Sequence, residues 1–182
     1  MDRLILLLAR GGGLGLAPKA PGTVGTLGGF PLTALLLVPG NFWIYLAGCA
    51  ALVPLSAWIC GEAERILDCE DPGEVVFDEI IAVPMCFLGV FAFMTFQGEG
   101  MPSVQSVLAM PWTWVWALAG FGLFRLIDIW KPGPIDHAQS IRKGWGVTMD
   151  DILAGLLTAV ILGRVYFGLQ KKKVQVELAP LW

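Results

Sequence analysis

The chain has 182 residues, of which 56% are hydrophobic and only 15% are charged, and its mean hydropathy is +0.70. Soluble domains carry about 25% charged residues, so this composition argues against a soluble domain and favours a protein embedded in lipid. The net charge of −3, without a basic run interleaved with aromatic residues, gives no support to nucleic-acid binding, and we expect no nucleic-acid partner.

Apolar stretches without acidic residues predict the membrane spans. A helix needs about 20 residues to cross a hydrocarbon core about 30 Å thick, and spans are helical because unpaired backbone groups are costly in lipid. The candidates are 27–38, 42–61, 80–98, 107–124 and 152–170. The first is short and rich in Gly and Pro, so it either crosses at a tilt or is re-entrant. The sequence thus predicts an all-α, polytopic membrane helical bundle of about four to five spans. We expect one membrane-embedded domain, 1–173, and a short C-terminal tail, 174–182.

The charged loops 62–79 and 125–151 are separated by two predicted crossings, which return the chain to the same side of the membrane. If both earlier segments also cross, residues 1–26 share that side. Most of the Lys and Arg residues lie there, so the positive-inside rule predicts that this side is cytoplasmic. The run Lys171–Lys173 fits the rule poorly if segment 152–170 crosses completely.

A stretch rich in Pro and Gly, 17–26, leads into the first apolar segment. We expect Thr23 or Thr26 to cap a helix that begins there, since Thr is a favoured N-cap residue. A helix start offers free N–H groups and the positive end of the helix dipole to an anion such as phosphate. Lys19, Thr23 and Thr26 would add donors. The alternative is a capped turn where the chain enters the membrane.

Two pairs of adjacent carboxylates lie at predicted helix starts. Asp78 and Glu79 precede span 80–98, and Asp150 and Asp151 are expected to open the last helix. One acid at each place would suffice to cap a helix, and burying an ionised carboxylate at a membrane edge is costly. Paired carboxylates suit Mg²⁺, which binds through one or two of them together with a substrate phosphate.

A third group follows span 107–124, where Arg125, Asp128 and Lys131 are spaced at i, i+3 and i+6. If the helix continues, Asp128 neighbours both cations, and Pro132 then ends it. The group is either a stripe of ion pairs at the membrane surface or a metal ligand flanked by phosphate-binding cations.

The remaining reactive side chains carry weaker signals. His137 is the single histidine and a candidate proton carrier, although a lone loop histidine more often has no catalytic role. The cysteines have no metal-ligand spacing, and we interpret them as reduced, packed thiols. They are Cys49, Cys60, Cys69 and Cys86.

Taken together, the predicted topology brings three acidic clusters and several cations to one membrane face. Acids interleaved with Arg, Lys and a Gly-Thr loop favour a metal-dependent phosphatase. Its predicted catalytic and metal-binding residues are Asp78, Glu79, Asp128, Asp150 and Asp151. Its predicted phosphate-binding residues are Lys19, Thr23, Thr26, Arg125 and Lys131. The alternatives are a small transporter or channel for a divalent cation or an anion, and a membrane scaffold whose charges only solvate its loops.

At these residues the chain resembles the phosphatidylglycerophosphatase A family. The resemblance covers most of residues 11–163. Its motifs are APGTVGTL at 20–27, DPGEVVFDE at 71–79, FRLIDIWKP at 124–132 and MDDILAG at 149–155. The chain departs from the family pattern at Ala82, at Gly133 and around Trp145.

The resemblance implies a multi-pass enzyme of the bacterial inner membrane that hydrolyses phosphatidylglycerophosphate to phosphatidylglycerol and phosphate with Mg²⁺. The lipid substrate and the surrounding membrane lipids are then its expected partners, and the active site would face the cytoplasm. Whether water attacks directly or one of the acids forms an aspartyl-phosphate stays open.

Overall fold

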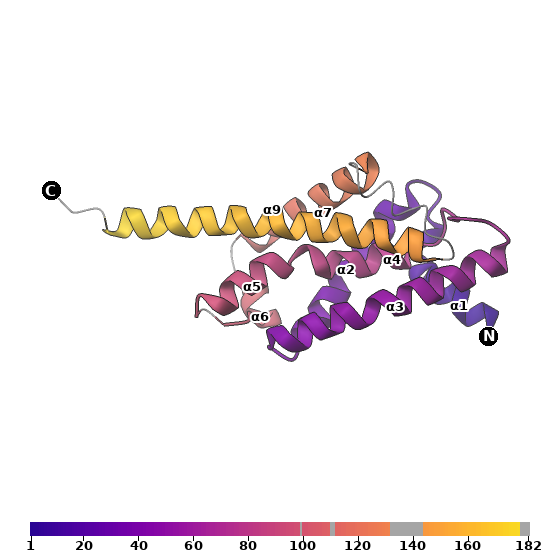
Figure 1. The fold of residues 1–182 in the computed structure, drawn as a ribbon, viewed down its shortest axis with the longest axis horizontal. Coiled ribbons are helices and arrows are strands. Elements are labelled where there is room, and N and C mark those ends of the chain that lie inside the picture. The colour runs from indigo at the N-terminus through magenta and orange to yellow at the C-terminus, as the bar shows by residue number, and fades with distance from the viewer. Residues whose placement is uncertain (99, 110–111, 132–143, 179–182) are drawn as a thin grey trace.

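The computed structural model describes residues 1–98, 100–109, 112–131 and 144–178, with the side chains of 173–178 excepted. The described residues form helices and no strands (Figure 1). The elements are α1 (Asp2–Ala9), the 3₁₀ helix η1 (Gly11–Leu16), α2 (Pro21–Leu37), α3 (Phe42–Leu67), α4 (Phe77–Cys86), α5 (Leu88–Phe96), α6 (Val104–Ala109), α7 (Thr113–Trp130) and α9 (Trp145–Leu178).

The successive α4 and α5 form the centre of the bundle, and the other long helices pack around them. Contacts along each helix give its direction. The start of α2 and the start of α9 lie beside the start of α4, whereas α3 begins beside Phe96 at the end of α5. Helices α2, α4–α5 and α9 therefore run one way, and α3 and α7 run the other. Three helix N-termini consequently meet at one end of the bundle.

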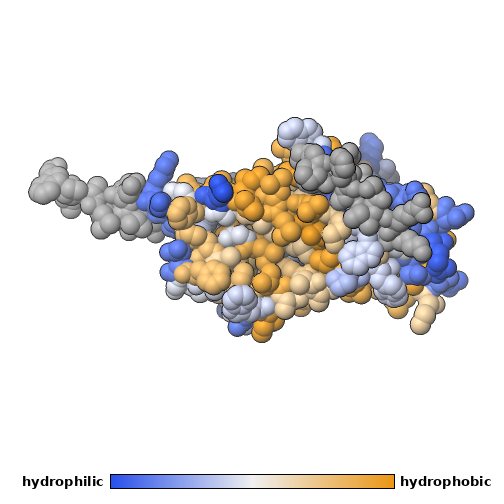
Figure 2. Space-filling view, in the orientation of Figure 1, coloured by the Kyte–Doolittle hydropathy of each residue, from blue (hydrophilic) through white to orange (hydrophobic). Residues whose placement is uncertain are grey.

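Among the described residues, four helices are long and apolar enough to cross a membrane, counting α4 and α5 as one broken helix. The apolar surface forms a band across the middle of the molecule, and hydrophilic residues gather at its ends (Figure 2). With 17 residues, α2 has a length of about 25 Å, slightly less than the hydrocarbon core. The expected all-α membrane bundle of about four to five spans, with a short helix among them, is confirmed.

The helix boundaries differ from the predicted ones where proline and local packing intervene. The predicted span 80–98 is broken at Phe87, because Pro84 cannot donate a backbone hydrogen bond within α4. The Tyr45 hydroxyl donates to the Pro84 carbonyl oxygen at 2.8 Å and fixes α3 against this break. The fourth span is shifted toward the C-terminus, as Thr113–Trp130 rather than 107–124, and the short α6 precedes it.

The last helix is much longer than the predicted span 152–170. It begins at Trp145, so Asp150 and Asp151 lie in its second turn rather than opening it. From Asp150 to Lys171 the helix rises about 31 Å, enough to cross the hydrocarbon core and to bring the lysine run to the opposite end. Residues 174–178 of the expected tail continue α9, and 179–182 lie outside the described residues.

Glycines on one face of α2 permit its close packing against α4. A methyl group added to Gly25 would lie 2.5 Å from Val76 Cβ, and one added to Gly29 would collide with Val83 and the carbonyl of Ile80. Such small residues let two helix backbones approach closely in a membrane, where packing drives helix association. The spacing of these glycines therefore sets the position of α2, and of the side chains at its first turns, relative to α4.

We expect Gly29→Ala to lower the midpoint of thermal unfolding of the purified protein in detergent. The added methyl group has no room, and overpacking of this kind costs about 1–3 kcal/mol. Gly122→Ala on α7 is the matched control, because its added methyl group meets nothing within 4 Å and alanine favours a helix over glycine. Equal stability of the two variants would show that α2 does not depend on this contact.

Candidate active site

A pocket of about 270 Å³ lies at the end of the bundle where the three helix N-termini meet. The start of α4, the end of α7, the second turn of α9 and the loop before α4 surround it. Among the described residues, six carboxylates and one ammonium line the pocket. They are Asp71, Asp78, Glu79, Asp128, Asp150, Asp151 and Lys131. Five of these acids were predicted as a single site from segments far apart in the sequence.

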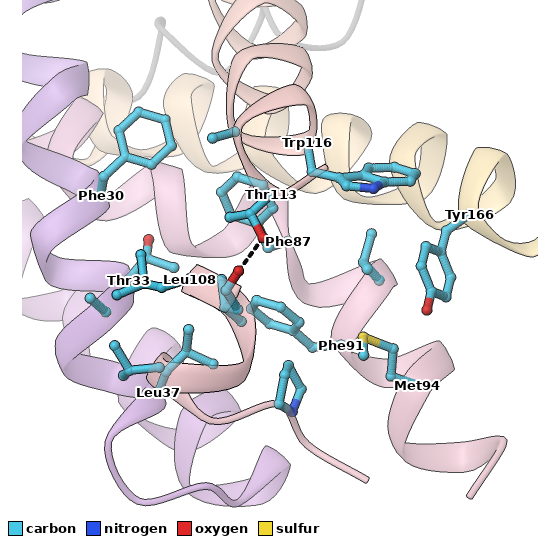
Figure 3. A pocket seen from close by; sticks show the side chains of 16 residues that line it. Phe30, Thr33, Leu37, Phe87, Phe91, Met94, Leu108, Thr113, Trp116 and Tyr166 are labelled. Atoms are coloured by element: carbon cyan, nitrogen blue, oxygen red, sulfur yellow. Dashed lines mark hydrogen bonds between the residues drawn. The ribbon is translucent and has the colours of Figure 1, made fainter. Parts of the chain in front are cut away.

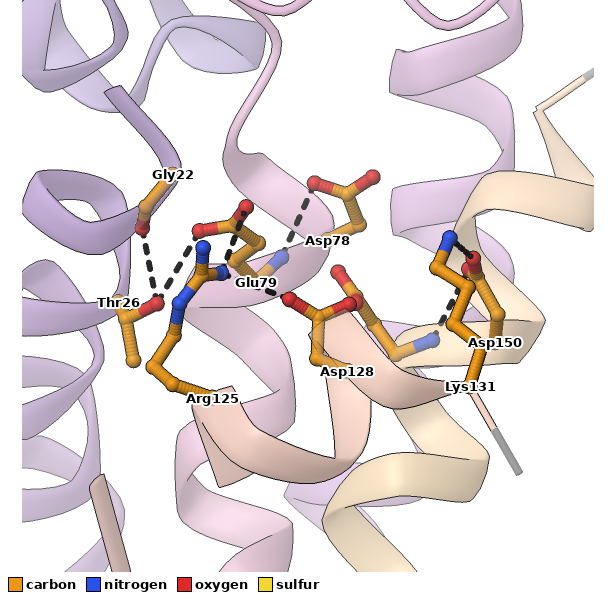
Figure 4. Close-up of polar contacts among 9 residues, drawn as sticks. Gly22, Thr26, Asp78, Glu79, Arg125, Asp128, Lys131 and Asp150 are labelled. Carbon is orange, nitrogen blue, oxygen red and sulfur yellow. Dashed lines mark hydrogen bonds and ion pairs between the residues drawn. The ribbon is translucent and has the colours of Figure 1, made fainter. Parts of the chain in front are cut away.

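Glu79 joins three helices at the edge of this pocket (Figure 4). Its Oε1 pairs with Arg125 Nη1 of α7 at 3.2 Å, and its Oε2 lies 3.1 Å from the Thr26 hydroxyl of α2. The Thr26 hydroxyl also lies 2.8 Å from the Gly22 carbonyl oxygen, so its one proton is shared between two acceptors. The fully buried Thr26 therefore contacts the acidic cluster directly.

Gly22 explains why the first turn of α2 can approach Glu79. A methyl group built on Gly22 would collide with Glu79 Oε1. Ala20 precedes the helix in the left-handed conformation, with φ +47°, and Pro21 occupies the first helical turn. Proline at this position costs no hydrogen bond, because the first N–H groups of a helix have no partner within it. The Pro-Gly-Thr sequence thus starts the helix and leaves room for the carboxylate.

Arg125 carries spare hydrogen-bonding capacity beside the pocket. Its Nη1 also donates to Asp128 Oδ2 at 2.8 Å, so one guanidinium nitrogen links two carboxylates. Its Nε is buried and has no partner within the described part of the chain. Because a buried unpaired N–H is costly, the guanidinium is poised to bind a further anion.

Lys131 ends α7 in the left-handed conformation, with φ +43°. This backbone turn brings its Nζ within 2.6 Å of Asp150 Oδ2 on α9. Burial disfavours the charged form of Lys131, but the hydrogen bond and the attraction of Asp150 outweigh burial and raise its pKa above the ordinary lysine value. The ammonium therefore stays charged and ties the end of α7 to α9.

Asp78 and Asp151 are buried in the pocket wall without a cationic partner. Their side chains are 2% and 4% exposed, and within the described ranges no Lys or Arg pairs with either carboxylate. Asp78 Oδ1 accepts a hydrogen bond from the Glu79 backbone at 3.0 Å. No group of three or more acidic, histidine or cysteine side chains among the described residues forms a ready-made metal site. The pocket thus holds more carboxylates than the described cations pair with.

Not all predicted site residues lie at the pocket. Lys19 is exposed in the loop before α2, and neither it nor Thr23 lines the pocket. Thr26 and Arg125 contact Glu79 at the edge of the pocket without lining it. The expectation that Thr23 or Thr26 caps α2 is wrong, since Ala20 is the N-cap and both threonines lie within the helix. His137 lies outside the described residues. Three of the four predicted packed cysteines are buried, but Cys69 is exposed.

Three supporting contacts carried no clear signal in the sequence. Arg10 pairs with Glu74 at 2.6 Å, and the Val76 backbone N–H donates to the Ala9 carbonyl oxygen at 2.9 Å. Together they tie the loop before α4 to the N-terminal helix. On the other side, the buried hydroxyls of Ser56 and Thr148 lie 3.1 Å apart and join α3 to α9. These contacts fix the elements that position Asp78 and Asp151.

Sequence comparisons place the chain among known proteins. The model of the family described as phosphatidylglycerophosphatase A matches residues 7–166. A phosphatidylglycerophosphatase A of Haemophilus influenzae is 33% identical over 90% of this chain and 89% of its own. One of Escherichia coli is 31% identical over 86% and 80%. A Bacteroides thetaiotaomicron protein, provisionally named a phosphatidylinositol-3-phosphatase, is 33% identical over 87% and 91%.

No solved structure matches the fold of this chain. The family match covers the whole charged pocket, from Asp71 in the loop before α4 to the second turn of α9, and leaves out only the ends of the chain. With this match and the identities to two relatives of that name, the chain belongs to the phosphatidylglycerophosphatase A family.

Proposed function

We propose that this membrane protein hydrolyses the phosphate monoester of phosphatidylglycerophosphate, giving phosphatidylglycerol and phosphate. The family assignment supports the reaction and the substrate. The observation that carries the proposal in the structure is a pocket of carboxylates at the end of an apolar bundle. Lys131 lines this pocket, and Arg125 pairs with two of its acids. A lipid can keep its chains in the bilayer while its phosphate reaches this end.

The chain's own residues can bind and orient the phosphate. Arg125 offers its buried, unpaired Nε to a phosphate oxygen, and the N-termini of α2, α4 and α9 direct the positive ends of their dipoles to the same place. The Lys131 ammonium adds a positive charge on the opposite side of the pocket. These groups offset the charge of the transferred phosphoryl group, which is how most phosphoryl transfer is catalysed.

The acids suit a divalent cation, and we propose Mg²⁺ bound by Asp78 and Asp151 together with the substrate phosphate. Magnesium keeps several waters and takes only one or two carboxylates, so it does not require a ready-made cage of three. When bound, the ion lowers the pKa of its water and neutralises phosphate charge. Glu79, Asp128 and Asp150 already hold Arg125 and Lys131, and they would keep these cations in place around the phosphate.

Hydrolysis joins a water oxygen to phosphorus and breaks the bond from phosphorus to the glycerol oxygen. We propose that water attacks directly and that a carboxylate of the pair Asp78 and Asp151 accepts its proton. Both acids are buried on the pocket wall, where they can hold a water in line with the phosphate. The glycerol oxygen leaves with the proton that the carboxyl group returns, and the phosphatidylglycerol goes back to the membrane.

We further propose that the pocket faces the cytoplasm at the bacterial inner membrane. The support is the density of Lys and Arg in the segments at this end of the bundle. The lysine run at the other end of α9 is the exception. A transporter or channel has no comparable support, because the predicted site acids gather in one pocket at the end of the bundle rather than along a path through it.

We expect Asp78→Asn and Asp151→Asn each to slow phosphate release from phosphatidylglycerophosphate in detergent micelles by about 10²–10⁴-fold. Each change keeps the shape of the side chain but removes the charge and the basic oxygen. The matched control is Asp68→Asn at an exposed position with φ +48°, where Asn is well tolerated. Phosphatidylinositol 3-phosphate is the comparison substrate.

Wild-type rates in both folded variants would rule out these acids as the catalytic pair. Much faster hydrolysis of phosphatidylinositol 3-phosphate than of phosphatidylglycerophosphate by the wild-type protein would overturn the proposed substrate. The assignment of the catalytic site would then still stand.

The midpoint of thermal unfolding in detergent tests magnesium binding independently of the catalysed reaction. We expect Mg²⁺ to raise the midpoint of the wild-type protein after EDTA treatment, since a ligand at about 100 times its Kd stabilises by about 2.7 kcal/mol. Asp78→Asn should lose this increase, and Asp68→Asn should keep it. Phosphate release at the full rate in EDTA, with no effect of Mg²⁺ on the midpoint, would contradict the metal.

A further inference from the structure

A second cavity, of about 260 Å³, lies deeper in the apolar part of the bundle, between α2, the α4–α5 break, α6 and α7 (Figure 3). Aliphatic and aromatic side chains make up nearly all of its lining. Its two threonines do not offer their hydroxyl protons to a ligand. Thr33 donates to the Gly29 carbonyl oxygen at 2.8 Å, and Thr113 donates to the Val107 carbonyl oxygen. The cavity therefore suits a hydrocarbon rather than a polar molecule.

Two of the helices that line this cavity, α2 and α7, also contact or line the charged pocket. On α2, Phe30 and Leu37 of the cavity follow Thr26 by four and eleven residues, or about 6 and 16 Å along the helix. On α7, Ala117 precedes Arg125 by eight residues, or about 12 Å. The cavity thus begins one helical turn below the phosphate-binding end and continues downward along the same helices.

This depth matches one leaflet of the bilayer. Half of a hydrocarbon core about 30 Å thick is about 15 Å, the interval over which an acyl chain descends from its head group. At the far end, α6 lies across the cavity with Val104, Val107 and Leu108 in its wall. An occupant that enters from the charged end would therefore meet apolar walls along its length, with α6 among them.

We propose that this cavity binds an acyl chain of the phosphomonoester lipid whose phosphate occupies the charged pocket. The inference rests on the proposed function. It adds recognition of the acyl chain, which the charged residues do not contact. A lipid whose phosphate lies at Arg125 has its chains at this depth beside α2 and α7. Contact with a chain of the substrate would raise the affinity for a membrane lipid over a soluble phosphomonoester.

The test compares long-chain (palmitoyl) with short-chain (butanoyl) phosphatidylglycerophosphate in the same detergent micelles. Ala117→Phe fills the cavity with an aromatic ring. We expect it to lower kcat/KM for the long-chain lipid about tenfold, because the ring takes the space of the chain and overlap in a packed apolar site is costly. The short-chain rate should change less than about twofold, because a short chain does not reach the filled space.

Ala51→Phe is the matched control, because Ala51 is exposed on α3 and does not line the cavity. It should leave both rates unchanged. An equal fall for the two substrates in Ala117→Phe, or no fall for either, would overturn the inference while leaving the phosphatase itself in place. Failure of the wild-type protein to hydrolyse either lipid would instead count against the proposed function.

Photolabelling tests the same cavity in the unchanged protein, whether or not Ala117→Phe folds. The probe is a non-hydrolysable phosphonate analogue of the lipid with a diazirine at the end of one acyl chain. We expect labelled residues among those that line the cavity, such as Phe91, Met94 and Trp116. Excess unlabelled long-chain phosphonate should suppress the labelling, and phosphatidylcholine should not. Equal suppression by phosphatidylcholine, or labelling spread over lipid-facing residues such as Leu118, would overturn the assignment to the substrate.

Discussion

The carboxylate of Glu79 is the point on which the arrangement of the charged end depends. It lies at the start of the central helix, contacts Thr26 of α2 at 3.1 Å and pairs with Arg125 of α7 at 3.2 Å. A carboxylate this close to a membrane core is costly unless it is paired and hydrogen-bonded, so these partners are required by its burial. Gly22 at the first turn of α2 follows from the same requirement, because a methyl group at this position would collide with Glu79 Oε1.

The need to pair buried carboxylates also divides the acids of the charged end into two groups. Glu79, Asp128 and Asp150 hold cations already provided by the chain, whereas no cation among the described residues pairs with the buried Asp78 and Asp151. A site that binds a charged phosphate beside acids needs additional positive charge, and this is the physical reason for a metal in the proposed reaction. The lower part of the helices provides the apolar environment in which the rest of a lipid substrate can remain.

Much of this structure could be predicted from the sequence, because a lipid environment strongly restricts which segments can form membrane spans. The lack of charge in long apolar stretches indicates the spans. Counting the predicted crossings then places Asp78, Asp128 and Asp151 at the same membrane face. The structure brings these residues together in one pocket. Local details were harder. A Pro-Gly-Thr stretch fits a threonine cap as well as a start at Pro21, and only packing against α4 decides between them. Contacts such as Arg10 with Glu74 depend on the fold and leave no local pattern.

An experimental structure with Mg²⁺ and a non-hydrolysable phosphonate analogue of phosphatidylglycerophosphate tests the central claim most directly. It would locate the phosphate group, the cation and the lipid chains in one measurement. The account predicts a phosphonate oxygen within hydrogen-bonding distance of Arg125 Nε and a cation between the carboxylates of Asp78 and Asp151. A phosphonate bound elsewhere, with these two acids free of any cation, would contradict the account.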